Sequence, residues 1–314
     1  MCRRQLNTEV ASNKLLELFK SLKNHKFIFV EPGGNFGDQL IYNGAYKLAL
    51  LAGLEYEKIS FESFKRTIFK ESDVIYFHGG GGFVPWWSGT PIEGLKKTIT
   101  MHAGITIVGP QSFSEDVSFL KKIFDFTSDK IICKECFIFT REITSFNNLK
   151  KVLPRQMVLD YDHDTALNLD EFDILKQRKV DNFVFYAIRN DKESSNDKSY
   201  FVSFPSLFFD PISYCRSFDD WVSVHSKAKK IITNRLHSSI LGSILGKPTV
   251  LLPNSYHKNH SVWDFSLQQR KVKWMDALPS YEEIKLNPLL KKLQRKLTKS
   301  YKVQSCLRFI YGIG

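Results

Sequence analysis

Short apolar runs alternate along the chain with polar or glycine-rich turns and with segments of helical spacing. Apolar runs at residues 26–31, 74–78, 105–108 and 137–140 predict four buried strands, and a helix is expected over residues 39–52. Each predicted strand runs directly into a turn. This alternation favours a parallel α/β sheet, in which ligand-binding loops gather at the carboxyl ends of the strands.

A second alternating set of segments begins at residue 182. Residues 182–188 and 230–233 predict strands, the next segment predicts a helix that ends at Gly246, and residues 249–252 resume a strand. The polar residues 170–181 are the best linker candidate. Two Rossmann-like domains facing a cleft are the simplest architecture for the two sets. The predicted parts are an N-terminal Rossmann-like domain at 1–172, a C-terminal Rossmann-like domain at 173–280 and a basic helical segment at 281–314.

Composition excludes several classes of protein. The 314 residues are 43% hydrophobic and 14% aromatic, which supports real cores in two domains and argues against wholesale disorder. No apolar run approaches the roughly 20 residues that a membrane-spanning helix needs. Residues 1–5 lead into a polar amphipathic segment rather than the apolar core of a signal peptide. We therefore expect a cytoplasmic protein.

The net charge of +12 favours an anionic binding partner, and many of the basic residues lie from Lys285 onward. Leucines interleave there with lysines and arginines at helical spacing, and Pro288 suits a first turn, so we predict a basic amphipathic helix. Two interpretations stay open. The helix either closes the fold with a solvated basic face or docks on an anionic membrane surface. No nucleic-acid motif accompanies the charge, so no nucleic-acid partner is predicted.

The segment from Thr233 to Pro248 is the most informative part of the chain. It places Arg235 and His237 where the carboxyl end of a strand meets the amino terminus of a helix. Free backbone N–H groups and the helix dipole favour an anion there. An arginine fork beside a titratable imidazole suits a small phosphorylated or carboxylated ligand. Arg189 follows another predicted strand and is either a second clamp or a surface arginine paired with Asp191.

Five short motifs, taken together and in order, resemble the polysaccharide pyruvyl transferase family. They are Gly34-Asn35-Phe36-Gly37-Asp38, the glycine run Gly79 to Gly82, Arg141-Glu142 with Ser145, Asp164-x-Ala166, and Arg235-Leu236-His237. The resemblance covers roughly residues 30 to 265. It implies a two-domain, glycosyltransferase-B-like fold and transfer of pyruvate from phosphoenolpyruvate onto a sugar as a ketal, with release of phosphate. One departure is Gln39, which follows Asp38 where the family commonly has an acidic residue.

For this chemistry the site needs an anion clamp and a general acid that protonates the methylene carbon of phosphoenolpyruvate. His237 is the first choice for the acid or base because the imidazole pKa lies near neutrality; the alternative is a structural histidine at the helix start. Asp38 either caps a helix or binds or deprotonates a sugar hydroxyl. The predicted catalytic residues are therefore His237 and Asp38, and the predicted donor-binding residues are Arg235, Leu236, Arg189 and Ser238.

The acceptor is expected at the N-terminal loops. Gly80 and Gly81 permit close backbone approach to a ligand, although a tight turn would also use glycine. Trp86 could stack on a sugar or anchor its loop, and Glu142 could face the cleft or simply favour a helix start. The predicted acceptor-binding residues are Asn35, Gly80, Gly81, Trp86 and Glu142.

No metal or cofactor is predicted, with phosphoenolpyruvate as the co-substrate. Cys133-x-x-Cys136 lacks a second pair at zinc spacing, and the resemblance implies no metal for the acidic group around Asp164. The acceptor is expected to be a saccharide, either polymeric or lipid-linked at the inner face of the plasma membrane. The alternatives are a nucleotide-sugar-dependent glycosyltransferase of the same fold and a non-catalytic saccharide-binding protein.

Overall fold

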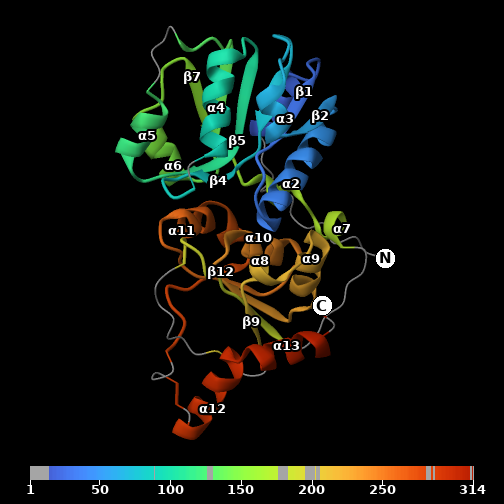
Figure 1. The fold of residues 1–314 in the computed structure, drawn as a ribbon, viewed down its shortest axis with the longest axis vertical. Helices are drawn as coiled ribbons and strands as arrows, with labels where there is room; N and C mark the ends of the chain where they lie inside the picture. Colours follow the sequence, from blue (N-terminus) through green and yellow to red (C-terminus); the bar gives the residue numbers. More distant parts are fainter. Residues whose placement is uncertain are drawn as a thin grey trace. The chain divides into compact units, whose positions relative to one another are not determined.

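The computed structural model describes residues 14–87, 89–125, 130–175, 183–194, 202, 206–280, 284–285, 287–311 and 313. The chain divides into two compact units, Met1–Leu169 and Asp170–Gly314. Each unit is built around its own sheet of parallel strands (Figure 1). The protein is therefore a mixed α/β protein with two parallel sheets, as the alternation of apolar runs predicts.

The sheet of the first unit has the strand order β2-β1-β3-β5-β6-β7, with β4 paired to β5. All of these pairings are parallel. The strands are β1 (Phe27–Glu31), β2 (Tyr56–Ser60), β3 (Val74–Phe77), β4 (Gly80–Phe83), β5 (Ile105–Phe113), β6 (Glu135–Thr140) and β7 (Met157–Tyr161). The helices are α1 (Lys14–Ser21), α2 (Phe36–Ala52), α3 (Phe61–Arg66), α4 (Thr90–Met101), α5 (Val117–Ile123), α6 (Ile143–Leu149) and the 3₁₀ turn η2 (Thr165–Asn168).

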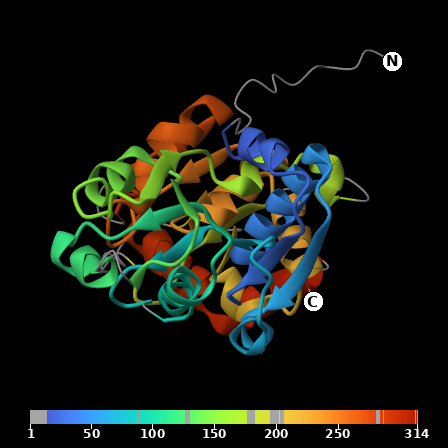
Figure 2. The same cartoon turned by 90° about the horizontal axis from the view of Figure 1, so that it is seen from above.

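Both faces of the first sheet are covered, which explains why its central strands are apolar throughout. On one face Phe19 of α1 packs edge-on against Phe27 and Tyr76, with ring centroids 5.3 Å apart in each pair. On the other face Val30 joins a cluster with Phe61 and Phe64 of α3. Figure 2 shows α1 (dark blue) and α4 (teal) on opposite sides of these strands.

The glycine-rich turns predicted after two strands are wrong in detail. β5 continues to Phe113, so residues 109–112 lie in the strand, and Gly80–Phe83 form the short strand β4. Gly109 is required at its position, because a Cβ atom there would lie 2.2 Å from the hydroxyl oxygen of Tyr76. The predicted helix over 39–52 begins earlier, at Phe36, and its N-cap is Asn35 rather than Asp38.

The second sheet has the order β12-β11-β10-β8-β9, again with parallel pairings. Its strands are β8 (Val184–Ala187), β9 (Ser206–Phe209), β10 (Lys230–Thr233), β11 (Thr249–Leu251) and β12 (Val272–Trp274). The helices are α7 (Glu171–Ile174), α8 (Pro211–Tyr214), α9 (Phe218–Lys227), α10 (Leu236–Ile244), α11 (Lys258–Val262), η3 (Trp263–Leu267), η4 (Gln268–Arg270), α12 (Pro288–Lys299) and α13 (Tyr301–Ile310). The predicted domain boundary at 172/173 falls within α7, and residues 176–182, which contain much of the predicted linker, lie outside the described residues.

The predicted basic C-terminal helix is two helices, divided at Ser300, which ends α12 and caps α13. α13 packs into the core, where Leu307 joins the cluster around Phe183 and Phe185. Gln304 also pairs with the edge strand β9: its Oε1 accepts from the Phe208 N–H at 2.8 Å, and its Nε2 donates to the Ser206 carbonyl at 3.1 Å. This side chain thus satisfies backbone groups that a sheet edge leaves unpaired.

Candidate functional site

The turn between β10 and α10 is held by its own side chains. The Thr233 hydroxyl donates to the Ala187 carbonyl at 2.6 Å and accepts from the Arg235 N–H at 2.9 Å. Arg235 is the N-cap residue of α10 and makes no side-chain cap, so its guanidinium is available to other groups. The predicted order of strand, turn and helix is confirmed, with Gly246 in the left-handed conformation (φ 64°) just beyond the helix.

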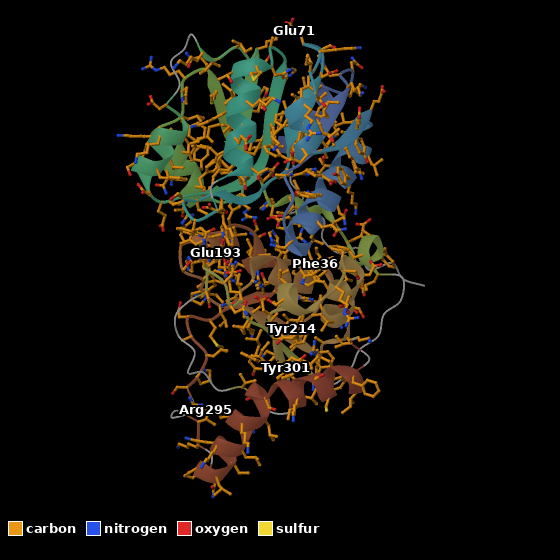
Figure 3. The ribbon with its side chains drawn as sticks, viewed as in Figure 1. Phe36, Glu71, Glu193, Tyr214, Arg295 and Tyr301 are labelled. Atoms are coloured by element: carbon orange, nitrogen blue, oxygen red, sulfur yellow. The ribbon has the colours of Figure 1, made fainter. Side chains whose placement is uncertain are left out.

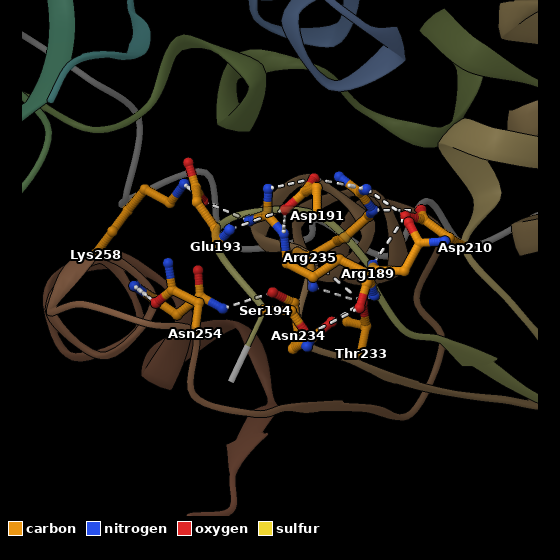
Figure 4. Close-up of polar contacts among 12 residues, drawn as sticks. Arg189, Asp191, Glu193, Ser194, Asp210, Thr233, Asn234, Arg235, Asn254 and Lys258 are labelled. Carbon is orange, nitrogen blue, oxygen red and sulfur yellow. Dashed lines mark hydrogen bonds and ion pairs between the residues drawn. The ribbon is translucent and has the colours of Figure 1, made fainter. Parts of the chain in front are cut away.

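Arg235 and Arg189 lie in a cluster with three carboxylates and a lysine (Figure 4). Arg189 forms a two-bond fork with Asp191, at 2.8 and 2.9 Å, and also contacts Glu193. Arg235 forms a second fork with Asp210, both bonds at 2.5 Å, and reaches Asp191 at 3.1 Å. Lys258 of α11 contacts Glu193. Asp191 therefore bridges the two arginines.

Two asparagines fix the loops that carry this cluster. Asn234 Oδ1 accepts from the Arg189 N–H at 2.8 Å, which ties the turn after β10 to the turn after β8. The Asn259 side chain donates to the carbonyls of Asn234 and Leu252 at 2.8 and 3.0 Å, which adds the turn after β11. Asp210 comes directly after β9 and accepts from the Asn190 N–H at 3.2 Å. The carboxyl ends of four strands are thus joined in one network.

The cluster is formally neutral, because three cations, Arg189, Arg235 and Lys258, face three carboxylates. Burial opposes ionisation of Asp191, but the hydrogen bonds and charge of Arg189 and the charge of Arg235 hold its pKa below the ordinary value. The two arginines are nearly buried, with side chains 7% and 11% exposed. Within the described residues Arg235 Nη1 donates to no partner, so the guanidinium of Arg235 is only partly used.

The start of α10 places the other predicted donor-binding residues. His237 is half-buried in the first turn. The Ser238 hydroxyl is buried and has no hydrogen-bond partner within the described part of the chain, a condition that a ligand or a water would relieve. Leu236 is buried in the core, so its side chain is not placed to contact a donor, and only its backbone N–H could do so.

A cavity of about 480 Å³ adjoins the cluster. Arg189, Asp210 and Asn234 line one part of it, and Tyr301, Gln304 and Arg308 of α13 line another. Figure 3 labels Tyr214 and Tyr301, two of its aromatic residues. The volume lies within the range of small-molecule sites, and most of the lining surface is apolar. The second unit therefore combines an arginine site with room for a small organic ligand.

In the first unit, three predicted acceptor-side residues converge on one point. Asn35 and Asp38 form a capping box, in which Asp38 Oδ2 accepts from the Asn35 N–H at 2.8 Å. A Cβ atom on Gly80 would lie 3.6 Å from Asp38 Oδ1 and 3.5 Å from Gln111 Oε1. Asp38 is thus not the N-cap residue, although its Oδ2 completes the capping box, and its Oδ1 lies toward Gly80, where it could contact a sugar hydroxyl.

Gln111 is a residue that the sequence analysis missed as a candidate. Its Oε1 is buried and has no hydrogen-bond partner among the described residues. It went unnoticed because residues 109–112 were expected to form a turn. His78 was also missed: its ring lies tilted against that of Tyr42 with centroids 4.2 Å apart, and burial lowers the pKa of the imidazole well below its ordinary value. His78 is therefore a neutral side chain in an aromatic core.

Glu142 lies at a helix start, which is one of the two roles that its position predicts. It has no exposed surface, and it caps α6 by accepting from the Ser145 N–H at 2.8 Å. Its neighbour Arg141 is equally buried and donates to Asp164 at 2.7 Å. Acceptor binding by Glu142 is not supported by this burial. Trp86 is half-buried and Gly81 partly exposed, which leaves both predictions for these residues open.

The carboxylates of the cluster were also missed, apart from the pairing of Arg189 with Asp191. Asp210 had a visible signal, since a carboxylate follows the apolar run at residues 207–209 and so marks the end of a strand. Glu193 had none, because only the folded loop brings it to Arg189.

Two features are absent from the described residues: a group of side chains that could bind a metal, and a helix that could span a membrane. No group of three or more His, Cys, Asp or Glu side chains there is arranged to hold a metal ion. None of the described helices combines the length and the apolar character needed to cross a membrane. Cys136 lies buried in β6, and both it and Cys133 are free thiols.

Comparisons with known proteins agree with this architecture. A solved structure of a functionally uncharacterised protein from Klebsiella pneumoniae subsp. pneumoniae NTUH-K2044 matches with a TM-score of 0.65 and 23% sequence identity, covering 84% of this chain and 98% of that one. A search of curated proteins found no match. The family model described as polysaccharide pyruvyl transferase matches residues 35–256, which is more than half of the chain and includes the start of α10 and both arginines of the cluster. The chain belongs to the polysaccharide pyruvyl transferase family, and is thus a transferase.

Proposed function

We propose that this protein transfers pyruvate from phosphoenolpyruvate to a sugar of a cell-surface polysaccharide or of its lipid-linked precursor. We place the reaction in the cytoplasm, at the inner face of the plasma membrane, with phosphoenolpyruvate as co-substrate and no other cofactor. The observation that carries the proposal is the cluster that holds Arg189 and Arg235 at the carboxyl ends of the second sheet (Figure 4), beside the first turn of α10 with His237 and Ser238. Family membership supports it.

The reaction requires few groups from the protein. A proton is added to C3 of phosphoenolpyruvate, two hydroxyl oxygens of one sugar bond to C2, and the C2–O bond to phosphate breaks. Of the two hydroxyl protons, one replaces the proton delivered to C3 and the other leaves with phosphate. The chain must therefore hold two anionic groups, supply an acid and accept protons.

The donor would be held at the start of α10. The unused donors of Arg235 Nη1, the Ser238 hydroxyl and the first free N–H groups of α10 suit the phosphate. Arg189 suits the carboxylate, since it keeps N–H donors beyond its fork with Asp191. An anionic donor must compete there with Asp191, because this carboxylate bridges both arginines.

His237 is our choice for the group that protonates C3, since it lies half-buried in the same helical turn as Ser238. The substitution His237→Gln should lower turnover by about 10²-fold or more, in the range usual for a general acid or base. The rate of phosphate release with saturating phosphoenolpyruvate measures the turnover. The variant His260→Gln is the matched control. Equal turnover in both variants would remove His237 from this role.

We assign the acceptor to the first unit, at Asn35, Asp38, Gly80, Gly81 and Trp86. Asp38 Oδ1 and the buried Gln111 Oε1 both lie near Gly80, so two acceptors are available to a sugar hydroxyl there. Gln111→Leu keeps the size of the side chain and removes the oxygen. It should raise KM for the saccharide while leaving KM for phosphoenolpyruvate unchanged.

The decisive experiment incubates the protein with phosphoenolpyruvate and a panel of lipid-linked and synthetic saccharides. Phosphate release together with a pyruvyl mass gain on the sugar, both lost in His237→Gln, would support the proposal. Binding of saccharide without phosphate release would favour a non-catalytic saccharide-binding protein instead.

One observation favours a second candidate, a nucleotide-sugar-dependent glycosyltransferase. The cavity beside the neutral cluster is largely apolar and is lined by Tyr214 and Tyr301, which suits the base of a nucleotide. This candidate predicts that a nucleotide raises the unfolding temperature of the protein and that phosphoenolpyruvate does not.

A further inference from the structure

We propose that α12 docks the protein onto an anionic lipid surface. The first observation is the exposure of its leucines: Leu289 is 78% exposed, and Leu290 and Leu293 are each 50% exposed. At 100° per residue the three side chains fall within one third of the helix circumference. An amphipathic helix of a soluble domain normally buries such a stripe, and within the described residues nothing buries these three.

The side of α12 opposite the leucines is basic. Lys291, Lys292, Arg295 and Lys296 all fall outside the leucine sector, and the helix contains no aspartate or glutamate. A leucine stripe bordered by lysine and arginine is the pattern of helices that lie in the plane of a lipid interface. The basic side chains add attraction to anionic headgroups, which apolar contact alone does not provide.

The neighbouring helix α13 also exposes apolar side chains, Tyr301, Phe309 and Ile310, but it buries others in the core. α13 packs Val303 and Leu307 against the core of the second unit, and its Gln304 is bonded to β9. It is α13, therefore, that closes the fold. The amino-terminal end of α12 extends away from the second sheet (Figure 1), and Arg295 lies on this helix (Figure 3).

Charge distinguishes a lipid surface from a second copy of the chain as the occupant. Two α12 helices packed through their leucines would bring four cations from each copy together, on proteins that each carry a net charge of +12. Repulsion between these like charges would oppose association of the two copies. An anionic surface instead complements them, so the charge argues for the membrane.

The carboxyl-terminal end of α12 also adjoins the cavity. Thr298, near the end of α12, and Tyr301, at the start of α13, both line the 480 Å³ cavity. A protein held by α12 would thus keep this cavity close to the lipid surface. The proposal does not rest on the proposed function, because lipid binding can be measured without turnover.

The test is co-sedimentation of the full chain with vesicles at physiological ionic strength. Vesicles of phosphatidylcholine with phosphatidylglycerol should retain the protein, and vesicles of phosphatidylcholine alone should not. The triple variant Leu289→Ser, Leu290→Ser, Leu293→Ser should lower the bound fraction at least tenfold. The matched control is Leu50→Ser with Leu51→Ser, which alters exposed leucines of α2 (69% and 61%) and should bind as the unaltered protein does.

A second variant tests the charge. Replacing Lys291, Lys292, Arg295 and Lys296 by glutamine keeps the leucines and should abolish retention on anionic vesicles. Retention of either variant at the unaltered level would overturn the proposal, as would equal retention on neutral vesicles. A dimer that the triple variant converts to a monomer would assign the leucines to a second copy instead. Turnover of a short soluble saccharide should be unchanged in both variants, so failure of the docking proposal leaves the proposed reaction standing.

Discussion

Both units contain an arginine from a family motif. One arginine is buried in a structural ion pair, and the other lies beside a candidate ligand site. Arg141 in the first unit is 1% exposed and donates to Ser112 at 2.8 Å and to Asp164 at 2.7 Å. Arg235 in the second unit is 11% exposed and meets Asp210 and Asp191 beside a helix start. The first is a closed pair that joins β5, β6 and η2. The second belongs to a partly used network that adjoins a cavity.

This difference indicates that an arginine in a motif can bind a ligand only if some of its guanidinium N–H groups have no partner within the protein. Burial removes Arg141 from any substrate, whatever its charge. Arg235 keeps its Nη1 donors and shares a bridging carboxylate with Arg189, so its contacts can be exchanged for those of an anion. Four predictions, including the pH dependence of Asp191, test whether the two arginines differ in this way.

The largest effect is expected from breaking the closed pair. Arg141→Met leaves Asp164 as an uncompensated buried carboxylate, which should cost about 3–5 kcal/mol of unfolding free energy. Chemical denaturation followed by circular dichroism measures this change in the free energy of unfolding. The double variant Arg141→Met with Asp164→Leu removes both charges and should recover much of the loss. A loss below 1 kcal/mol in the single variant would show that Arg141 does not stabilise the first unit.

Arg235→Lys should have the second largest effect, and it should appear in the kinetics. Lysine keeps the charge but loses the fork, so kcat/KM for phosphoenolpyruvate should fall about 10- to 100-fold, as expected for 1.5–3 kcal/mol of charged hydrogen bonding. The unfolding temperature should change little. Arg216→Lys, at an exposed position of the second unit, is the control. Unchanged kinetics together with a large loss of stability would make Arg235 a structural arginine like Arg141.

The two arginines also show which structural features could be predicted from the sequence. The strand, turn and helix around Arg235 follow from local apolar spacing, so they are visible in the sequence and are confirmed. The strand β4 and the extension of β5 were missed, because glycine-rich residues resemble turns until a neighbouring strand pairs with them. The burial of Arg141 was equally invisible, since Ser112 and Asp164 lie far from it along the chain.

The arginine cluster itself was predicted only in part. That Arg189 and Arg235 lie at the same sheet edge follows from each coming directly after a strand. Their neutralisation does not, because Asp210 and Glu193 reach them only through the folded loops. The exposure of the leucines of α12 was likewise open, since a leucine stripe indicates an apolar face without naming what covers it.

A smaller effect is expected from Asp191→Asn. This carboxylate bridges the arginines that the donor would use, so its neutral form should lower KM for phosphoenolpyruvate by about two- to fivefold, the range of a partly exposed ion pair. Steady-state kinetics at varied donor concentration measure the change, with Asp219→Asn as the control at an exposed position of α9. A higher KM would mean that Asp191 orients the arginines rather than competing with the donor.

The smallest effect is the pH dependence that Asp191 contributes. Burial opposes its ionisation, but Arg189 and Arg235 outweigh burial and hold the pKa of Asp191 below its ordinary value of about 3.9. A carboxylate with a lowered pKa in the folded state contributes stability that is fully present above the ordinary value and is lost as the pH falls through the folded value. The difference in unfolding temperature between the unaltered protein and Asp191→Asn should therefore be constant from pH 7 to pH 5 and shrink below about pH 4. A difference that stays constant to pH 3 would show that the arginines do not favour the ionised form, and Asp191 would then be a spectator in the cluster.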